Sequence, residues 1–139
     1  MSSVWIMSCN AKNVDAVSCF AQGFNLVVKK TRELKLNDIV FLYMAKPFGR
    51  IMYCCRVTND LVANEVARSN RFVVNKSDYS FGAKGVELTL LKPMATDSLT
   101  YDDLKKHGVG QLLNPSRISE KTLRHILRVE PELEVYLNA

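Results

Sequence analysis

Two short apolar runs near the N-terminus constrain the fold of this chain more than any other feature. Residues 4–9 read Val-Trp-Ile-Met-Ser-Cys, and residues 39–44 read Ile-Val-Phe-Leu-Tyr-Met after the turn pair Asn37-Asp38. Runs of this length bounded by turn signals predict strands, and the second run, apolar throughout, predicts a strand buried on both faces. Each run carries an aromatic residue close to polar groups. We therefore expect two strands whose C-terminal ends can build one small pocket.

The rest of the chain predicts four further strands and several short helices. The strands are expected over residues 26–28, 51–57, 71–74 and 86–91. Helices are expected from an Asn13 cap to Gly23, from a Thr100 cap to His107, from a Ser119 cap over residues 120–129, and from Pro131 onward. Residues 59–70 favour a short helix or a loop anchored by Leu61, Val62 and Val66, and residues 76–85 favour a loop. Five or six strands with helices at the edges predict an α+β fold, with a mixed sheet curled into a small barrel.

Length and composition favour one domain over residues 1–139, with the helical segment at about 99–138 packed on the barrel. The chain has 139 residues, of which 47% are hydrophobic, so it can bury one core. It contains no apolar stretch near the roughly 18 residues of a membrane span, and its N-terminus lacks the positive region of a secretory signal. We therefore expect a cytoplasmic protein without a membrane partner.

The ionisable and nucleophilic residues argue against an enzyme. The four cysteines form no Cys-x-x-Cys pair, and His107 and His125 lie far from them in the sequence, so we expect no metal site and no cofactor. Adjacent Cys54 and Cys55 would point to opposite faces of a strand. Cys9 has no neighbouring base. The chain also lacks a glycine-rich phosphate loop.

Each residue of the expected pocket has two interpretations. Trp5 is either a core residue or an aromatic plate on which a base can stack. Ser8 and Asn10 offer donors and acceptors for a base edge, or they form a plain turn. Tyr43 either closes the core or lines the pocket. The sequence leaves these alternatives open.

A net charge of +5 suits a nucleic-acid partner without requiring one. The basic residues form three groups, and the first two flank the strands of the expected pocket, as a phosphate-binding rim would. An ordinary solvated surface explains any one group equally well. The groups are Lys29, Lys30, Arg32 and Lys35; Lys46 and Arg50; and Arg68, Arg71, Lys76 and Lys84.

Several short motifs, in order over roughly residues 4–128, resemble the EVE domain of the PUA-like superfamily. Val4-Trp5-Ile6-Met7 resembles its opening strand, residues 38–43 resemble its Gly-Asp-Leu-Val-Phe-Phe-Tyr strand, and Ile51 to Val57 fits the strand that follows. Residues 99–107, Gln111 and Arg117-Ile118-Ser119 resemble its Leu-x-x-Leu and Gln-x-x-Arg-Leu-Ser segments.

This resemblance implies a pseudo-barrel related to YTH, ASCH and PUA domains, which bind a flipped, modified base beside a basic surface. The implied base-pocket residues are Trp5, Ser8, Cys9, Asn10, Tyr43 and Ser119, and the implied phosphate-binding residues are Lys29, Lys30, Arg32, Lys46, Arg50 and Arg117. The chain departs from the family at ligand-contacting positions. It has Ser8-Cys9-Asn10-Ala11 in place of Lys-Ser-Glu-Pro, Met44-Ala45 in place of His-Ser, and no Tyr-Gln-Ala-Arg-Asn loop.

The expected function is recognition of a modified base, in DNA rather than RNA, without catalysis. The resemblance also suggests a restriction or defence association with a partner nuclease. One alternative is a protein-interaction or small-ligand domain that binds no nucleic acid. Another is an ASCH-type hydrolase, which would need a lysine, a glutamate and a hydroxyl in one cleft, with Lys30 and Glu33 as the nearest candidates.

Overall fold

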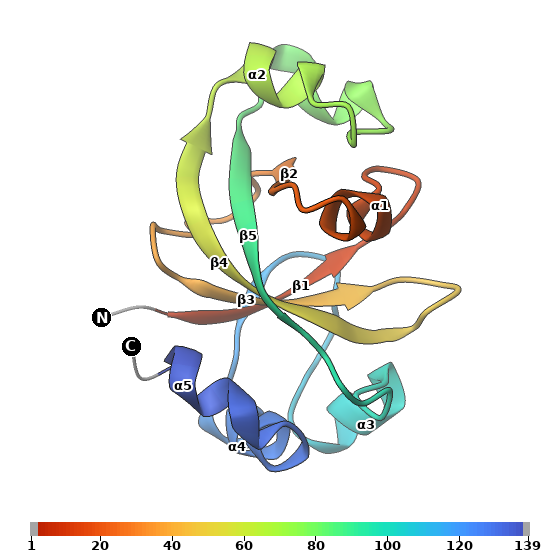
Figure 1. Cartoon of the computed structure of the whole chain (residues 1–139), viewed down its shortest axis with the longest axis vertical. Coiled ribbons are helices and arrows are strands. Elements are labelled where there is room, and N and C mark those ends of the chain that lie inside the picture. The colour runs from red at the N-terminus through yellow and green to blue at the C-terminus, as the bar shows by residue number, and fades with distance from the viewer. Residues whose placement is uncertain (1–2, 138–139) are drawn as a thin grey trace.

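Six strands form one curled, mixed sheet in the computed structural model, which describes residues 3–137 (Figure 1). The strands are β1 (Val4–Cys9), β2 (Leu26–Lys29), β3 (Ile39–Met44), β4 (Arg50–Val62), β5 (Gly85–Pro93) and β6 (Ser116–Arg117). Their order across the sheet is β2-β5-β4-β3-β1-β6. The β1–β3 pair is parallel and the other neighbouring pairs are antiparallel. The predicted α+β fold with a mixed, barrel-like sheet is confirmed.

Short helices cover both ends of the sheet (Figure 1). They are α1 (Ala16–Ala21), α2 (Asn64–Ser69), η1 (Lys76–Gly82), α3 (Tyr101–Lys106), α4 (Glu120–Val129), η2 (Pro131–Leu133) and α5 (Glu134–Leu137). α1 and α2 lie toward one end of the molecule, and α3, α4 and α5 lie toward the other. No helix within residues 3–137 is long and apolar enough to cross a membrane.

Two helix starts follow the local rules of the sequence. The Thr100 side chain accepts a hydrogen bond from the Asp103 backbone N–H, and the Ser119 side chain accepts one from the Thr122 backbone N–H. Each hydroxyl satisfies a backbone donor that the first turn leaves unpaired. Both predicted caps are therefore confirmed.

The sheet is covered on both faces, which explains why β3 is apolar throughout. Trp5 and Leu42 belong to the core cluster on one face, while Ile6 and Phe41 pack with the C-terminal helices on the other. Successive side chains of a strand point to opposite faces, so each of β1 and β3 supplies both cores. The predicted burial of residues 39–44 follows from this arrangement, in which only Tyr43 is partly exposed.

Three sequence predictions about the α1 and β4 regions are wrong. Asp15, rather than Asn13, caps α1 and accepts from the Ser18 backbone N–H. β4 continues to Val62 because its second half pairs with the start of β5. Leu61 and Val66 are exposed rather than anchoring, whereas Val62 is buried.

The segment between β4 and β5 also differs from expectation. Residues 71–74 form no strand and make only an isolated bridge between Val14 and Val73. Residues expected as a loop form the 3-10 segment η1, whose Asn75 cap accepts from the Ser77 backbone N–H. Tertiary contacts overrode the β propensity of residues 71–74, because their backbone groups bond to the loop before α1, with Val74 N–H donating to the Asn13 carbonyl and the Phe72 carbonyl accepting from Asp15 N–H.

Candidate functional site

A cavity of about 190 Å³ opens at the seam where the curled sheet does not close. β2 is one edge of the sheet, and β6 at the other edge pairs with Trp5 and Ile6 only. The C-terminal half of β1 therefore extends beyond β6 and faces the cavity, and β2 supplies the opposite wall. The strand residues that line it are Met7, Ser8 and Cys9 from β1 and Val27, Val28 and Lys29 from β2.

Polar groups from several loops complete the cavity. Asn10, Asn13 and Thr31 follow the ends of β1 and β2, and Asp78 and Asn114 come from more distant segments. The Asn10 Oδ1 accepts a hydrogen bond from the Lys12 backbone N–H at 2.9 Å, so its amide N–H₂ is left as the donor group. The cavity thus combines apolar strand side chains with donors and acceptors, as small-molecule and base sites do.

The aromatic wall of the cavity is Tyr79 from η1. Asn64 positions this segment, since its Nδ2 donates to the Tyr79 and Ala83 backbone carbonyls at 2.6 Å each. Tyr79 is 2% exposed, and its hydroxyl has no hydrogen-bond partner within residues 3–137. Burial, with a smaller contribution from Asp78, raises the pKa of Tyr79 to about 12. No sequence signal indicates this role, because the composition of residues 76–85 favours a loop.

Three of the six expected base-pocket residues meet at this cavity. Ser8, Cys9 and Asn10 all line it. Burial, with a smaller contribution from Asp15, raises the pKa of the Cys9 thiol to about 12. Cys9 is therefore a neutral, packed side chain at neutral pH rather than a nucleophile.

Trp5 lies in the core beneath the cavity rather than in its wall. Its side chain is 6% exposed, and its indole Nε1 donates to Asp38 Oδ2 at 2.9 Å. The Arg117 guanidinium lies over the ring, 5.4 Å from the centroid. Of the two interpretations of Trp5, the structure shows the core position.

Tyr43 and Ser119 also lie away from the cavity. Tyr43 is the register partner of Ser8, and its side chain packs on the face of the sheet opposite that of Met7 and Cys9, 6.3 Å from the Tyr101 ring. Ser119 caps α4 and lines a separate cavity of about 90 Å³ together with Arg117. The expected pairing of Trp5 with Tyr43 in one pocket fails because Trp5 and Tyr43 belong to the core clusters of opposite faces.

Among the expected phosphate-binding residues, Lys29 lines the cavity itself. The Lys30 Nζ donates to the Asp60 backbone carbonyl at 2.8 Å, and Arg32 is exposed beside it. Lys46 and Arg50 lie at the turn between β3 and β4. The hydrolase alternative gains no geometric support, because neither Lys30 nor the exposed Glu33 lines this cavity.

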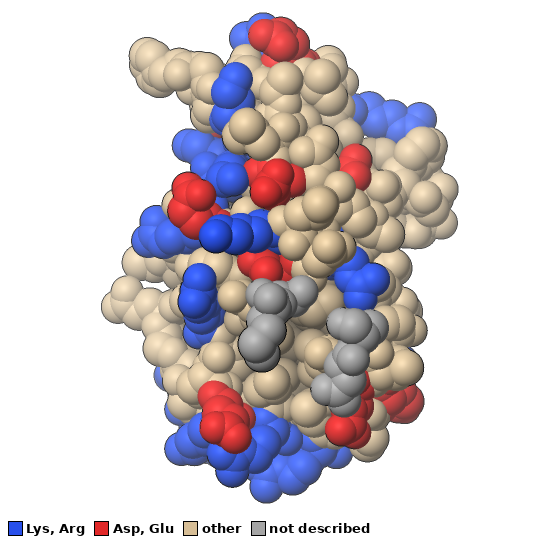
Figure 2. Space-filling view, turned by 90° about the vertical axis from the view of Figure 1, so that its left-hand side faces the viewer, with Lys and Arg blue, Asp and Glu red and all other residues tan. Residues whose placement is uncertain are grey.

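A basic surface that the sequence analysis did not single out lies on α4. Lys121, Arg124 and Arg128 line a shallow groove there, with Leu127 and Glu134. Their spacing of three and four residues puts them on one side of the helix. Figure 2 shows Lys and Arg gathered at the end of the molecule where α4 lies, whereas basic and acidic groups alternate over the middle of that face.

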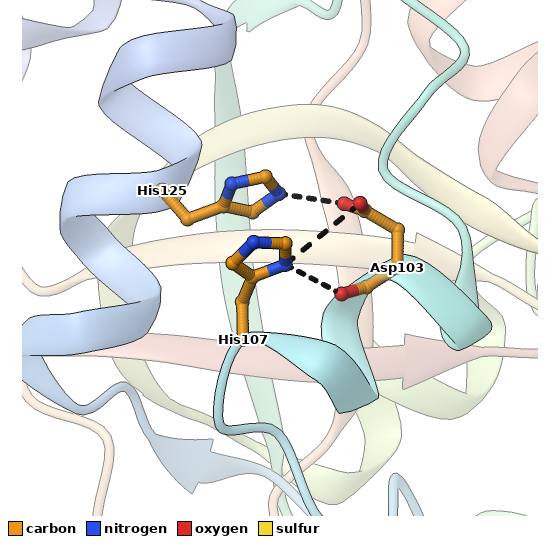
Figure 3. Close-up of side chains that lie close together, drawn as sticks. All are labelled: Asp103, His107 and His125. Carbon is orange, nitrogen blue, oxygen red and sulfur yellow. Dashed lines mark hydrogen bonds and ion pairs between the residues drawn. The ribbon is translucent and has the colours of Figure 1, made fainter.

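Asp103, His107 and His125 form a cluster at the α3–α4 junction (Figure 3), and none of the three lines the cavity. His125 Nε2 lies 2.6 Å from Asp103 Oδ2, and the two imidazole rings stack with centroids 3.5 Å apart. Sequence spacing did not predict this cluster, because Asp103 and His125 are 22 residues apart.

Comparison with known proteins identifies the fold. No family model and no curated protein sequence matches the chain, but solved structures do. Human THYN1, in complex with DNA containing 5-methylcytosine, has a TM-score of 0.68 at 13% identity, over 93% of this chain and 98% of that one. The ASCH protein of Zymomonas mobilis has a TM-score of 0.66 at 12% identity, over 91% of this chain and 95% of that one.

The fold is a PUA-like pseudo-barrel, which this chain shares with the solved ASCH and THYN1 structures. A protein from Leishmania major has the same fold, with a TM-score of 0.64 at 14% identity over 96% of this chain and 98% of that chain. The resemblance found in the sequence motifs is confirmed for the fold. Identities this low show the fold and leave the ligand to be argued from the cavity.

Proposed function

We propose that this protein binds nucleic acid and takes a modified base, flipped out of its strand, into the cavity between β1 and β2. The observation that carries the proposal is the cavity itself. It lies at the open seam of the sheet, and strand side chains, an aromatic ring and amide donors line it together. Flipping a base costs a few kcal/mol of unstacking, and edge hydrogen bonds and ring contacts in a pocket offset that cost.

The dimensions and chemistry of the cavity suit one base. A cavity of roughly 150 Å³ accepts one benzene ring, and this one has a volume of about 190 Å³, enough for a pyrimidine with a small substituent. The Asn10 amide N–H₂ supplies donors for a base edge. Val27 and Val28 supply an apolar wall against which a methyl group can pack.

The charge distribution supports a strand backbone at the rim of the cavity. Lys29 lines the cavity and Arg32 is exposed nearby in the sequence, so both can contact phosphates beside a bound base. Human THYN1, with the same fold, was crystallised with DNA containing 5-methylcytosine, which makes DNA the first substrate to test. A binding role fits the cavity better than catalysis. Among its described lining residues Asp78 is the one carboxylate, none is a histidine, and the thiol of Cys9 is protonated.

The test is binding to matched oligonucleotides. Single- and double-stranded DNA and RNA would carry 5-methylcytosine, 5-hydroxymethylcytosine, N6-methyladenine or no modification, and each would be titrated at two salt concentrations. We expect one modified base to bind more tightly than its plain counterpart. Equal, salt-sensitive binding to all oligonucleotides would exclude base recognition. No binding at low salt would favour the protein-interaction alternative.

Two variants connect the binding to the cavity. Asn10→Ala removes the amide donors that Asn10 presents at the cavity, so selectivity for the modified base should disappear while binding to plain DNA remains. Lys29→Gln removes one lining charge and should reduce the salt slope by about one for a duplex. The control is Lys12→Gln, which removes an exposed charge that does not line the cavity. Unchanged selectivity in Asn10→Ala would place the base elsewhere.

A further inference from the structure

The cluster of Asp103, His107 and His125 lies at the junction of α3 and α4, near the end of the molecule opposite α2 (Figure 3). Asp103 is in α3, His107 is its C-cap residue, and His125 is in α4. One ligand atom from each residue can be chosen so that all three lie within 4.8 Å of one another. Two imidazoles and a carboxylate are a common set of three protein ligands for a divalent transition metal.

The side chains are already orientated by hydrogen bonds that suit metal ligands. His107 Nδ1 lies 2.8 Å from the Asp103 backbone carbonyl, which can only accept, so the neutral ring carries its proton there and keeps the Nε2 lone pair free. Histidines that bind metals usually donate their other N–H to a carbonyl or carboxylate in this way. His125 Nε2 points at Asp103 Oδ2 from 2.6 Å, as Figure 3 shows.

Two neighbouring basic side chains pair with carboxylates other than that of Asp103. On α3, Lys105 pairs with Asp102 at 3.6 Å and lies over the Tyr101 ring. On α4, Arg124 pairs with Glu120 at 3.0 Å. The Asp103 carboxylate contacts imidazole nitrogens instead, at 2.6 Å from His125 and 3.8 Å from His107.

The cluster is open on one side and supported on the other. The His125 side chain is 11% exposed, whereas those of Asp103 and His107 are 28% and 29% exposed. A metal could therefore enter from solvent and keep a water molecule as a further ligand. Ligands of one tetrahedral metal lie roughly 3.4 Å apart. The two rings are stacked and parallel, so metal binding would turn them until both nitrogen lone pairs point to one position.

We propose that Asp103, His107 and His125 bind one divalent transition metal, Zn²⁺ or a similar ion, and thereby fix α3 to α4. This inference is independent of the cavity between β1 and β2. The metal would take the place of the hydrogen bond between His125 and Asp103. The sequence did not indicate this site, because the proposed ligands come from two helices and include no close pair of cysteines.

The test is a titration of the untagged protein with Co²⁺, followed by displacement with Zn²⁺. We expect one equivalent of Co²⁺ to produce visible absorption bands of a nitrogen- and oxygen-ligated ion, and Zn²⁺ to abolish them. Thermal unfolding in Zn²⁺ should shift to a higher midpoint. His107→Gln and Asp103→Asn should each weaken binding by at least about tenfold, and the Zn²⁺-dependent thermal shift should disappear.

Asp102→Asn is the matched control, because Asp102 is exposed on the same helix and pairs only with Lys105 among the described residues. It should bind the metal as the unsubstituted protein does. His107→Gln keeps the test usable if Asp103→Asn does not fold, since the His107 side chain is partly exposed. Three results would each overturn the proposal: no absorption change, equal binding by His107→Gln, or a near-ultraviolet thiolate band showing that cysteines hold the ion.

Discussion

Asp38→Asn should destabilise the fold by removing the buried carboxylate to which Trp5 is bonded. Asp38 is 4% exposed and accepts three hydrogen bonds of 2.9 Å. The donors are the Trp5 indole Nε1 and the backbone N–H groups of Ser3 and Lys35. This carboxylate thus joins the starts of β1 and β3 and the turn before β3. The Trp5 position depends on it.

The size of the effect follows from these three bonds. An asparagine oxygen at the Oδ2 position keeps the bonds from Trp5 and Lys35, but each loses about 1 kcal/mol because the acceptor is no longer charged. The amide N–H₂ then faces the Ser3 N–H, and that unmade bond costs about 1–3 kcal/mol. Relief of carboxylate desolvation opposes these losses. We expect a net loss of about 2–3 kcal/mol from a total of roughly 5–15 kcal/mol.

Urea unfolding followed by tryptophan fluorescence measures this loss, since Trp5 is the only tryptophan. The midpoint should fall by about 1 M with an unchanged slope, given slopes of about 1–3 kcal/mol/M. Asp102→Asn makes the same chemical change at an exposed site and should shift stability by less than about 0.5 kcal/mol. A loss below about 1 kcal/mol in Asp38→Asn would refute the bracing role of the carboxylate.

Two further stability predictions rest on buried side chains. Tyr79→Phe removes a buried hydroxyl that has no hydrogen-bond partner within residues 3–137. The free energy of unfolding should therefore rise by about 1 kcal/mol and Tm by a few degrees. A lower Tm in calorimetry would show that the hydroxyl is hydrogen-bonded in solution. Burial raises the pKa of Cys54 from 9.0 to about 12. The buried, protonated Cys54 thiol therefore makes its full contribution to stability below pH 9. This contribution is lost as the pH rises toward 12, because the thiol of the unfolded chain ionises first. Urea unfolding of Cys54→Ala near pH 11 should show a smaller alkaline loss than the unsubstituted protein, and equal losses would contradict this.

Local sequence rules predicted the elements that depend on neighbouring residues. β1 and β3 follow from apolar runs with turn signals at their ends, and α4 follows from a Ser119 cap and an apolar stripe. The motif resemblance also anticipated the PUA-like fold. The prediction of a strand at residues 71–74 failed, because these residues bond to the loop before α1 rather than to a strand of the sheet.

The candidate site could be predicted only in part. The sequence pointed to Ser8, Cys9 and Asn10 because they follow an apolar strand, and these residues do line the cavity. It could not supply the facing wall from β2, or Tyr79, because both reach the cavity through long-range packing. It also placed Trp5 and Tyr43 together, although strand alternation sends them to opposite faces once the register is set.

The sequence by itself therefore determined the main strands, the caps of α3 and α4 and the polar end of β1, since each of these depends on residues a few positions apart. Only the tertiary structure decided which groups meet. The Trp5 indole bonds to Asp38, 33 residues away in the sequence, and Asp103 contacts His125, 22 residues away. Strand register and the curl of the sheet set those distances, and both result from packing the whole chain around its cores.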